Sequence, residues 1–175
     1  ARAALRDGRG PALHVPDNAD LTGSDLIIRD TAPRPETDAY GRGLEITGNS
    51  QVEVDRVLMA NNHSVGLFVS DSGSLATIRD LEIFGTQLSP ECVEFSCQAT
   101  LADGVSSLLE GSAILDNVWI HDNAQFGLRA QADDSLIVRR GGIERNKTGI
   151  QVSSPIFDYR LVNFEVLFVD NAVDV

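Results

Sequence analysis

The tetrad Gly43-Leu44-Glu45-Ile46 is one of six related tetrads that recur along the chain and set its architecture. The others are Ala12-Leu13-His14-Val15, Gly66-Leu67-Phe68-Val69, Gly104-Val105-Ser106-Ser107, Gly127-Leu128-Arg129-Ala130 and Gly149-Ile150-Gln151-Val152. Their first residues are 31, 23, 38, 23 and 22 positions apart, so the repeat is about 23 residues long, with insertions in the first and third units. A period in this range is typical of a solenoid, whose repeats pack on one another.

Each unit also contains a second and a third short alternating segment, for example at Leu21 and at Leu26/Ile28 in the first unit. Gly, Asn, Asp and Ser turns separate the segments, and no helical pattern intervenes, which excludes βαβ units. We predict an all-β, right-handed parallel β-helix of about six coils, with three short strands per coil, over residues 1–175 as one domain. Because the chain lacks an initial Met and a visible cap, we expect it to be a segment of a longer protein.

One turn of the repeat carries a column of polar residues. Its members are Thr31, Asn62, Thr86, Asn123, Asn146 and Asn171. Asn tolerates left-handed backbone geometry, and stacked carboxamides can hydrogen-bond from coil to coil. We therefore predict an asparagine ladder at this turn, with a structural and not a catalytic role.

Composition limits the classes of function. The chain is 42% hydrophobic but only 6% aromatic, which favours an aliphatic core and excludes disorder. Its formal net charge of -12 would repel nucleic acid and anionic lipid surfaces, and no apolar run is long enough for membrane insertion. We expect no nucleic-acid partner and no membrane insertion, which leaves basic partners and neutral ligands.

The two cysteines, Cys92 and Cys97, are five positions apart in one loop. With no other cysteine in the chain and the histidines distant in sequence, a local disulfide is expected rather than a metal site. A disulfide favours an oxidising compartment, so we expect a secreted or cell-surface protein. Two free thiols in a cytosolic protein remain the alternative.

The glycine-led strands and the ladder at Asn62, Asn123 and Asn146 resemble the right-handed β-helix repeat domains of the pectate-lyase-like superfold. The segments 41–46 and 144–150 and the cysteine loop are similar to secreted bacterial β-helix repeat proteins, most of them without an assigned activity. The superfold includes polysaccharide lyases, polysaccharide hydrolases, carbohydrate esterases, phage tailspikes and non-catalytic surface proteins. Fold alone does not choose among these functions.

The resemblance implies that any active site would lie on the outward face of the first strands. That face presents His14, Glu45, Phe68, Ser106, Arg129 and Gln151. Glu45 and Arg129 are three coils, or about 14 Å, apart, too far for one metal-and-base site, and Glu45 has no acidic neighbour for glycoside hydrolysis. His14, Glu45 and Arg129 are therefore weak catalytic candidates. A polysaccharide lyase or glycoside hydrolase fragment is the alternative to a binding module.

The insertions 32–42 and 87–103 fall at the same turn and should flank His63, forming the walls of a groove. Aromatic surface combined with hydrogen-bonding groups is what a sugar ligand needs. The predicted ligand-binding residues are Tyr40, Arg42, Glu45, Thr47, His63, Phe68, Ser70 and Phe95. The alternative is that the two loops only cover the core.

A second surface is predicted on outward positions of the other strands. It consists of Ile27, Leu58, Ile114, Trp119 and Ile137. Aligned apolar columns favour contact with a partner domain or a second copy, and Trp119 as a sugar platform is the alternative.

We expect no cofactor, with calcium as the one ion to consider. Glu110, Asp133 and Asp134 are weak calcium candidates at the first turn, where a solvated acidic edge is the alternative. The sequence as a whole predicts a secreted or cell-surface β-helix module with a non-catalytic binding or structural role and with carbohydrate contact.

Overall fold

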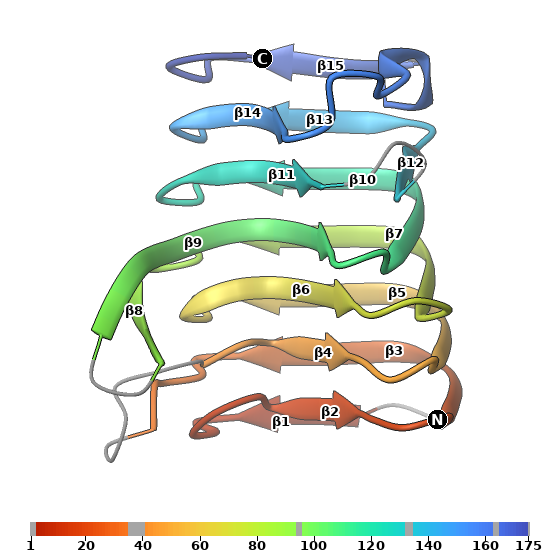
Figure 1. The fold of residues 1–175 in the computed structure, drawn as a ribbon, viewed down its shortest axis with the longest axis vertical. Coiled ribbons are helices and arrows are strands. Elements are labelled where there is room, and N and C mark those ends of the chain that lie inside the picture. Colours follow the sequence, from red (N-terminus) through yellow and green to blue (C-terminus); the bar gives the residue numbers. More distant parts are fainter. Residues whose placement is uncertain (1–2, 35–40, 94–95, 132–134, 163–164, 175) are drawn as a thin grey trace.

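A computed structural model describes residues 3–34, 41–93, 96–131, 135–162 and 165–174, while the side chains of residues 90–100 lie outside this description. Parallel strands stack into two sheets that run the length of the molecule (Figure 1). The first sheet has the order β1 (Ala3–Arg6), β3 (Asp20–Arg29), β5 (Gln51–Ala60), β7 (Leu75–Phe84), β10 (Ser112–His121), β13 (Gly141–Glu144) and β15 (Val166–Val169), with β12 (Leu136–Val138) beside β10.

The second sheet is built from the first strand of each repeat. Its order is β2 (Leu13–Val15), β4 (Leu44–Ile46), β6 (Ser64–Ser70), β9 (Ser96–Leu108), β11 (Phe126–Ala130) and β14 (Thr148–Val152). The hydrogen-bonded register places Leu13, Leu44, Leu67, Val105, Leu128 and Ile150 in a single column. Leu44, Leu67 and Leu128 in this column are fully buried. The predicted parallel β-helix is therefore confirmed, and its aliphatic core runs lengthwise between the two sheets.

The second and third strands predicted for each repeat are joined more closely than expected. In β3, β5, β7 and β10 they form one ten-residue strand that bends at a residue with a left-handed backbone. The bend residues are Asp25, Arg56, Asp80 and Asn117, with φ between 55° and 58°. In the next repeat, the two segments remain separate as β12 and β13. A single left-handed residue thus turns the chain without interrupting the sheet.

The predicted asparagine ladder is present at the turn that leads from the first sheet to the second. The Oδ1 atom of Asn146 accepts hydrogen bonds from the backbone N–H and the Nδ2 of Asn123, both at 3.0 Å. The Oδ1 of Asn171 accepts in the same way from Asn146, and Asn146 Nδ2 also donates to the carbonyl of Ile120. These side chains satisfy backbone groups that the turn would otherwise leave unpaired in a buried position.

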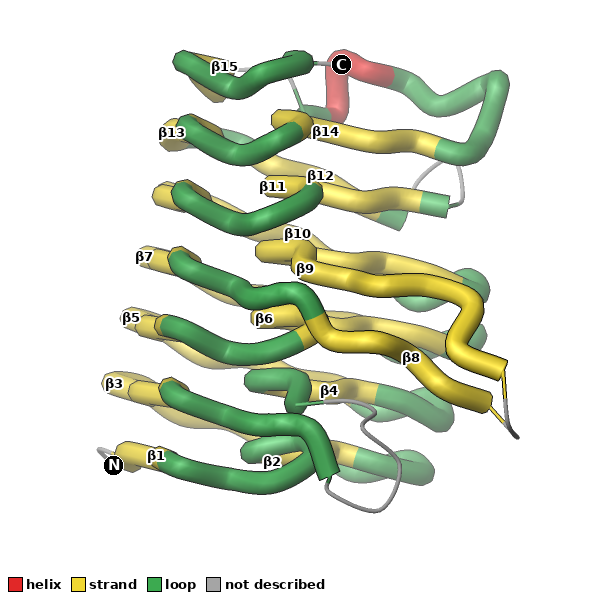
Figure 2. The backbone as a smooth tube through the Cα atoms, turned by 90° about the vertical axis from the view of Figure 1, so that its left-hand side faces the viewer, coloured by secondary structure: helices red, strands yellow, loops and turns green. Residues whose placement is uncertain are grey.

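The longer third repeat forms a hairpin. Strand β8 (Ser89–Val93) pairs with the start of β9 in antiparallel fashion, and the hairpin projects away from the stacked coils (Figure 2). Residues 102 and 103, which the sequence assigned to the insertion, already pair with β6. Cys92 and Cys97 stand opposite each other in the hairpin register, and their side chains, like those of Tyr40 and Phe95, lie outside the described part. The disulfide therefore stays a prediction.

Candidate functional site

A pocket of about 340 Å³ opens on the outer face of β2, β4 and β6. It is lined by Pro11, His14, Arg34, Arg42, Glu45, Phe68 and Ser70. Four of the predicted ligand-binding residues, Arg42, Glu45, Phe68 and Ser70, thus lie around one hollow, as does the weak catalytic candidate His14. We call this hollow the Arg42 pocket.

The floor of the Arg42 pocket follows from strand alternation. In a β-strand, successive side chains point to opposite faces, so the residue after each buried leucine points outward. Glu45 and Phe68 follow the buried Leu44 and Leu67, and His14 follows the partly buried Leu13. The register places Glu45 beside His14 on one side and beside Phe68 on the other. An imidazole, a carboxylate and an aromatic ring therefore come from neighbouring strands whose backbones are about 4.8 Å apart.

Arg42 is the central side chain of the pocket. Its Nη1 donates to Glu45 Oε1 at 2.7 Å, and its guanidinium carbon lies 3.7 Å from the centroid of the Phe68 ring. The side chains of Arg42 and Glu45 are only 7% and 13% exposed. An ion pair this well shielded, stacked on an aromatic face, keeps the guanidinium in one orientation. The pocket thus contains a guanidinium and a carboxylate that are held in place by each other.

The remaining polar groups around the pocket have defined partners of their own. His14 Nε2 shares a hydrogen bond of 3.0 Å with Thr47 Oγ1, while Glu45 bonds to Arg42, so His14 and Glu45 bond to different partners. His63 lies between the backbones of Gly41 and Gln87, and its Nδ1 bonds to the carbonyl of Thr31. Thr47 and His63 do not line the pocket.

Arg129 belongs to a different cluster, whose central residue the sequence analysis missed. Asp103 is fully buried, and its Oδ2 accepts a hydrogen bond of 2.7 Å from Ser106 Oγ and lies 3.7 Å from Arg129 Nη1. Asp103 directly precedes the lead glycine of its repeat, as Arg42 and Phe126 do in theirs. A comparison of the residues that directly precede the lead glycines would therefore have drawn attention to Asp103.

The Asp103 carboxyl has a perturbed acidity. Burial raises its pKa from 3.8 to about 6, and the Ser106 hydroxyl, the Arg129 charge and the N–H groups of Phe126 and Ala102 oppose this rise. Its Oδ1 has no hydrogen-bond partner among the described atoms. A carboxyl with a pKa near 6 can exchange a proton at physiological pH. Asp103, however, is fully buried, so a polymer in solution would not reach its carboxyl group.

The calcium candidates are only partly described. Glu110 is an exposed turn residue with a φ of 66°, and Asp133 and Asp134 lie outside the described residues. In the part of the chain that the structure describes, no group of three or more His, Cys, Asp or Glu side chains is placed to hold a metal ion. Within the same residues, no helix has the length and apolar character needed to span a membrane.

Comparison with known proteins gives one match. The family described as "Right handed beta helix region" matches residues 42–174. No curated protein and no solved structure matches the chain. The family match covers most of the sequence and agrees with the two parallel sheets and the ladder. The chain therefore belongs to the right-handed β-helix family.

Proposed function

We propose that the protein is an extracellular β-helix module that binds a glycan, without catalysis, in the Arg42 pocket. The observation that carries the proposal is the arrangement of Arg42, held by Glu45 and stacked on Phe68. Sugar hydroxyls need several oriented donors and acceptors, and an immobilised guanidinium beside a carboxylate supplies both at low entropic cost. The exposed His14 and the nearly buried Ser70 add a donor and an acceptor at the rim.

The size of the site agrees with this proposal. About 340 Å³ falls at the lower end of the range for ligand pockets, which suits one or two sugar units of a longer chain. For the catalytic alternative, the pair of Asp103 and Arg129 is closed off from solvent at Asp103. In the Arg42 pocket, Glu45 is bonded to Arg42 and is the single carboxylate among the described lining residues. Binding therefore has better support than hydrolysis or elimination.

A location outside the cell is part of the proposal and rests on the sequence. Cys92 and Cys97 are the only cysteines in the chain, and the backbone register of the β8–β9 hairpin sets them opposite each other. Disulfides between paired cysteines persist in oxidising compartments such as the extracellular space, where a glycan-binding module would encounter polysaccharides.

The test is a glycan array followed by calorimetry with the best oligosaccharide. Arg42→Gln should weaken binding at least tenfold, because it removes both the ion pair and the stacked cation, and His14→Ala should weaken it severalfold. Arg56→Gln is the matched control, since Arg56 forms an exposed ion pair with Asp25 on the other sheet. Circular dichroism verifies that each variant folds. The proposal fails if the array stays blank, or if Arg42→Gln and His14→Ala bind as the parent does.

A further inference from the structure

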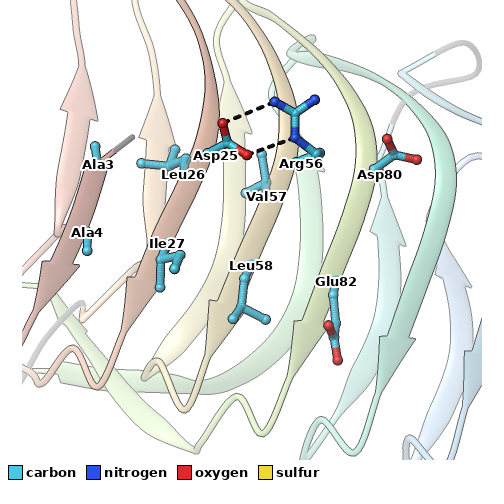
Figure 3. A pocket seen from close by; sticks show the side chains of 10 residues that line it. All are labelled: Ala3, Ala4, Asp25, Leu26, Ile27, Arg56, Val57, Leu58, Asp80 and Glu82. Atoms are coloured by element: carbon cyan, nitrogen blue, oxygen red, sulfur yellow. Dashed lines mark hydrogen bonds and ion pairs between the residues drawn. The ribbon is translucent and has the colours of Figure 1, made fainter. Parts of the chain in front are cut away.

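A second and larger pocket lies on the outer face of the other sheet. It has a volume of about 540 Å³ and spans β1, β3, β5 and β7 (Figure 3). Ile27 and Leu58, two residues of the predicted apolar surface, form its floor, and the acidic residues Asp80 and Glu82 bound it on β7. Neither the ladder nor the Arg42 pocket uses this face.

The floor is apolar because of the strand register. Ile27 pairs with Leu58, Leu58 pairs with Glu82, and Glu82 pairs with Trp119, so the four outward side chains form one row along the solenoid axis. Ile27 and Leu58 are half-buried, and Trp119 is 45% exposed. The row thus changes from aliphatic to acidic to aromatic in three steps of about 4.8 Å each.

The charges around the pocket are unbalanced. Asp25 and Arg56 neutralise each other through two hydrogen bonds of 2.8 and 3.0 Å, as the dashed lines in Figure 3 show. Asp80 accepts a hydrogen bond from the uncharged Asn117 amide, and Glu82 Oε1 lies 3.5 Å from His121 Nε2. Among the residues that the structure describes, no arginine forms a hydrogen bond with these two carboxylates, although the charges of Arg56 and Arg140 act on Asp80 from a distance. The chain as a whole carries a net charge of -12. A cationic group is the electrostatic complement of this wall.

Trp119 strengthens the preference for a cation. Its indole is stacked on His121, with 4.1 Å between ring centroids, and its Nε1–H donates to Glu144, so the ring is held in place. A guanidinium or ammonium group bound at Glu82 would lie one coil from this exposed aromatic ring. Carboxylate and aromatic face together are the usual surroundings of a bound Arg or Lys side chain.

We propose that this pocket binds an extended segment of a partner protein that places an aliphatic side chain over Ile27 and Leu58 and, two residues later, an Arg or Lys at Glu82. The spacing follows from geometry. A point midway between Ile27 and Leu58 lies one and a half coils, or about 7 Å, from Glu82. Residues i and i+2 of an extended segment point to the same side and are about 6.6 Å apart, whereas residues i and i+1 point to opposite sides.

The probe is the peptide acetyl-Ser-Leu-Ser-Arg-Ser-amide, titrated into the ¹⁵N-labelled protein and followed by NMR. We expect shifts confined to amides of β3, β5, β7 and neighbouring β10, with a Kd below about 1 mM. Two control peptides, one with Glu in place of Arg and one with Leu and Arg adjacent, should bind at least fivefold more weakly. A peptide that binds no more tightly than these controls would overturn the proposal.

Variants of the protein locate the contact. Leu58→Ser should weaken binding about tenfold and Glu82→Gln about fivefold, because they remove the apolar floor and the cation partner respectively. Glu53→Gln is the control, since Glu53 is an exposed carboxylate on β5 that is paired with Arg79 and is not among the residues lining the pocket. Unchanged affinity in Leu58→Ser and Glu82→Gln would refute the proposal. So would sedimentation showing a dimer that Leu58→Ser dissociates, because the occupant would then be a second copy.

Discussion

Replacing Asp103 with Asn should remove most of a pH dependence of stability that the buried carboxyl creates. Burial raises the pKa of Asp103 to about 6 in the folded protein, compared with an ordinary value of 3.8. The folded state therefore keeps the proton over a range of pH in which the unfolded chain has lost it. The resulting stabilisation is fully present below about pH 4 and is lost as pH rises through 6.

The magnitude follows from the two pKa values. A difference of about two pH units corresponds to about 3 kcal/mol over the whole range. Between pH 4.5 and 7.5, where the protein is easier to handle, the loss attributable to Asp103 is about 2 kcal/mol. Asp103→Asn keeps an oxygen that can accept the Ser106 hydroxyl bond but has no titrating proton. Between pH 4.5 and 7.5, the free energy of unfolding should therefore decrease in both proteins by amounts that differ by about 2 kcal/mol, the decrease being smaller in Asp103→Asn than in the parent.

The assay is urea unfolding at pH 4.5, 6.0 and 7.5, followed by far-UV circular dichroism and by the fluorescence of Trp119, the only tryptophan. Asp116→Asn is the control, because Arg140 bonds to this half-buried carboxylate and lowers its pKa. The stability that Asp116 contributes is lost only as pH falls below its ordinary pKa, so its profile should parallel that of the parent above pH 4.5. A parallel profile for Asp103→Asn would refute the assignment of a raised pKa.

Two further predictions concern the ladder and the close packing of coils. Asn146→Ala should lower the free energy of unfolding by about 2–4 kcal/mol in the same urea assay, because the buried carboxamide loses four hydrogen bonds. Gln51→Ala is the control, since Gln51 is exposed and its loss should cost less than about 1 kcal/mol. Gly127→Ala should destabilise by more than about 2 kcal/mol, because a Cβ there would meet the Ile143 Cγ2 at 2.6 Å and the Gly149 carbonyl oxygen at 2.8 Å. Gly23→Ala, with nothing within 4 Å, should unfold at the parent's midpoint, and an equal loss at both glycines would contradict the packing argument.

The stack of coils was predictable because one residue of the repeat fixes the direction of its neighbours. Once Leu44, Leu67 and Leu128 are aligned, alternation places every second side chain in the core, and the parallel register follows from the equal period. The ladder was predictable for the same reason, since Asn62, Asn123 and Asn146 each follow the lead glycine of their repeat by 19 residues. Neither inference needs knowledge of side-chain conformation.

The chemistry of the outer face was less predictable, for two physical reasons. Arg42 has a flexible side chain, and only the three-dimensional contacts show that it lies on Phe68 and bonds to Glu45. Asp103 was overlooked because the third repeat is lengthened, and sequence spacing alone does not show where the detour ends and pairing with β6 resumes. The left-handed bend at Arg56 was also hidden, because arginine carries no preference for that backbone region.

The β8–β9 hairpin leaves the stack and returns without disturbing it, since Val105 pairs with Leu67 on one side and with Leu128 on the other. Both ends of the excursion pair with the preceding coil, Gln87 with His63 and Ala102 with Ser64, so the stack holds the two ends in place. This corner is therefore a natural grafting position. A foreign peptide of ten to thirty residues inserted between residues 89 and 100 should be displayed on a rigid rod, at a fixed height along its axis.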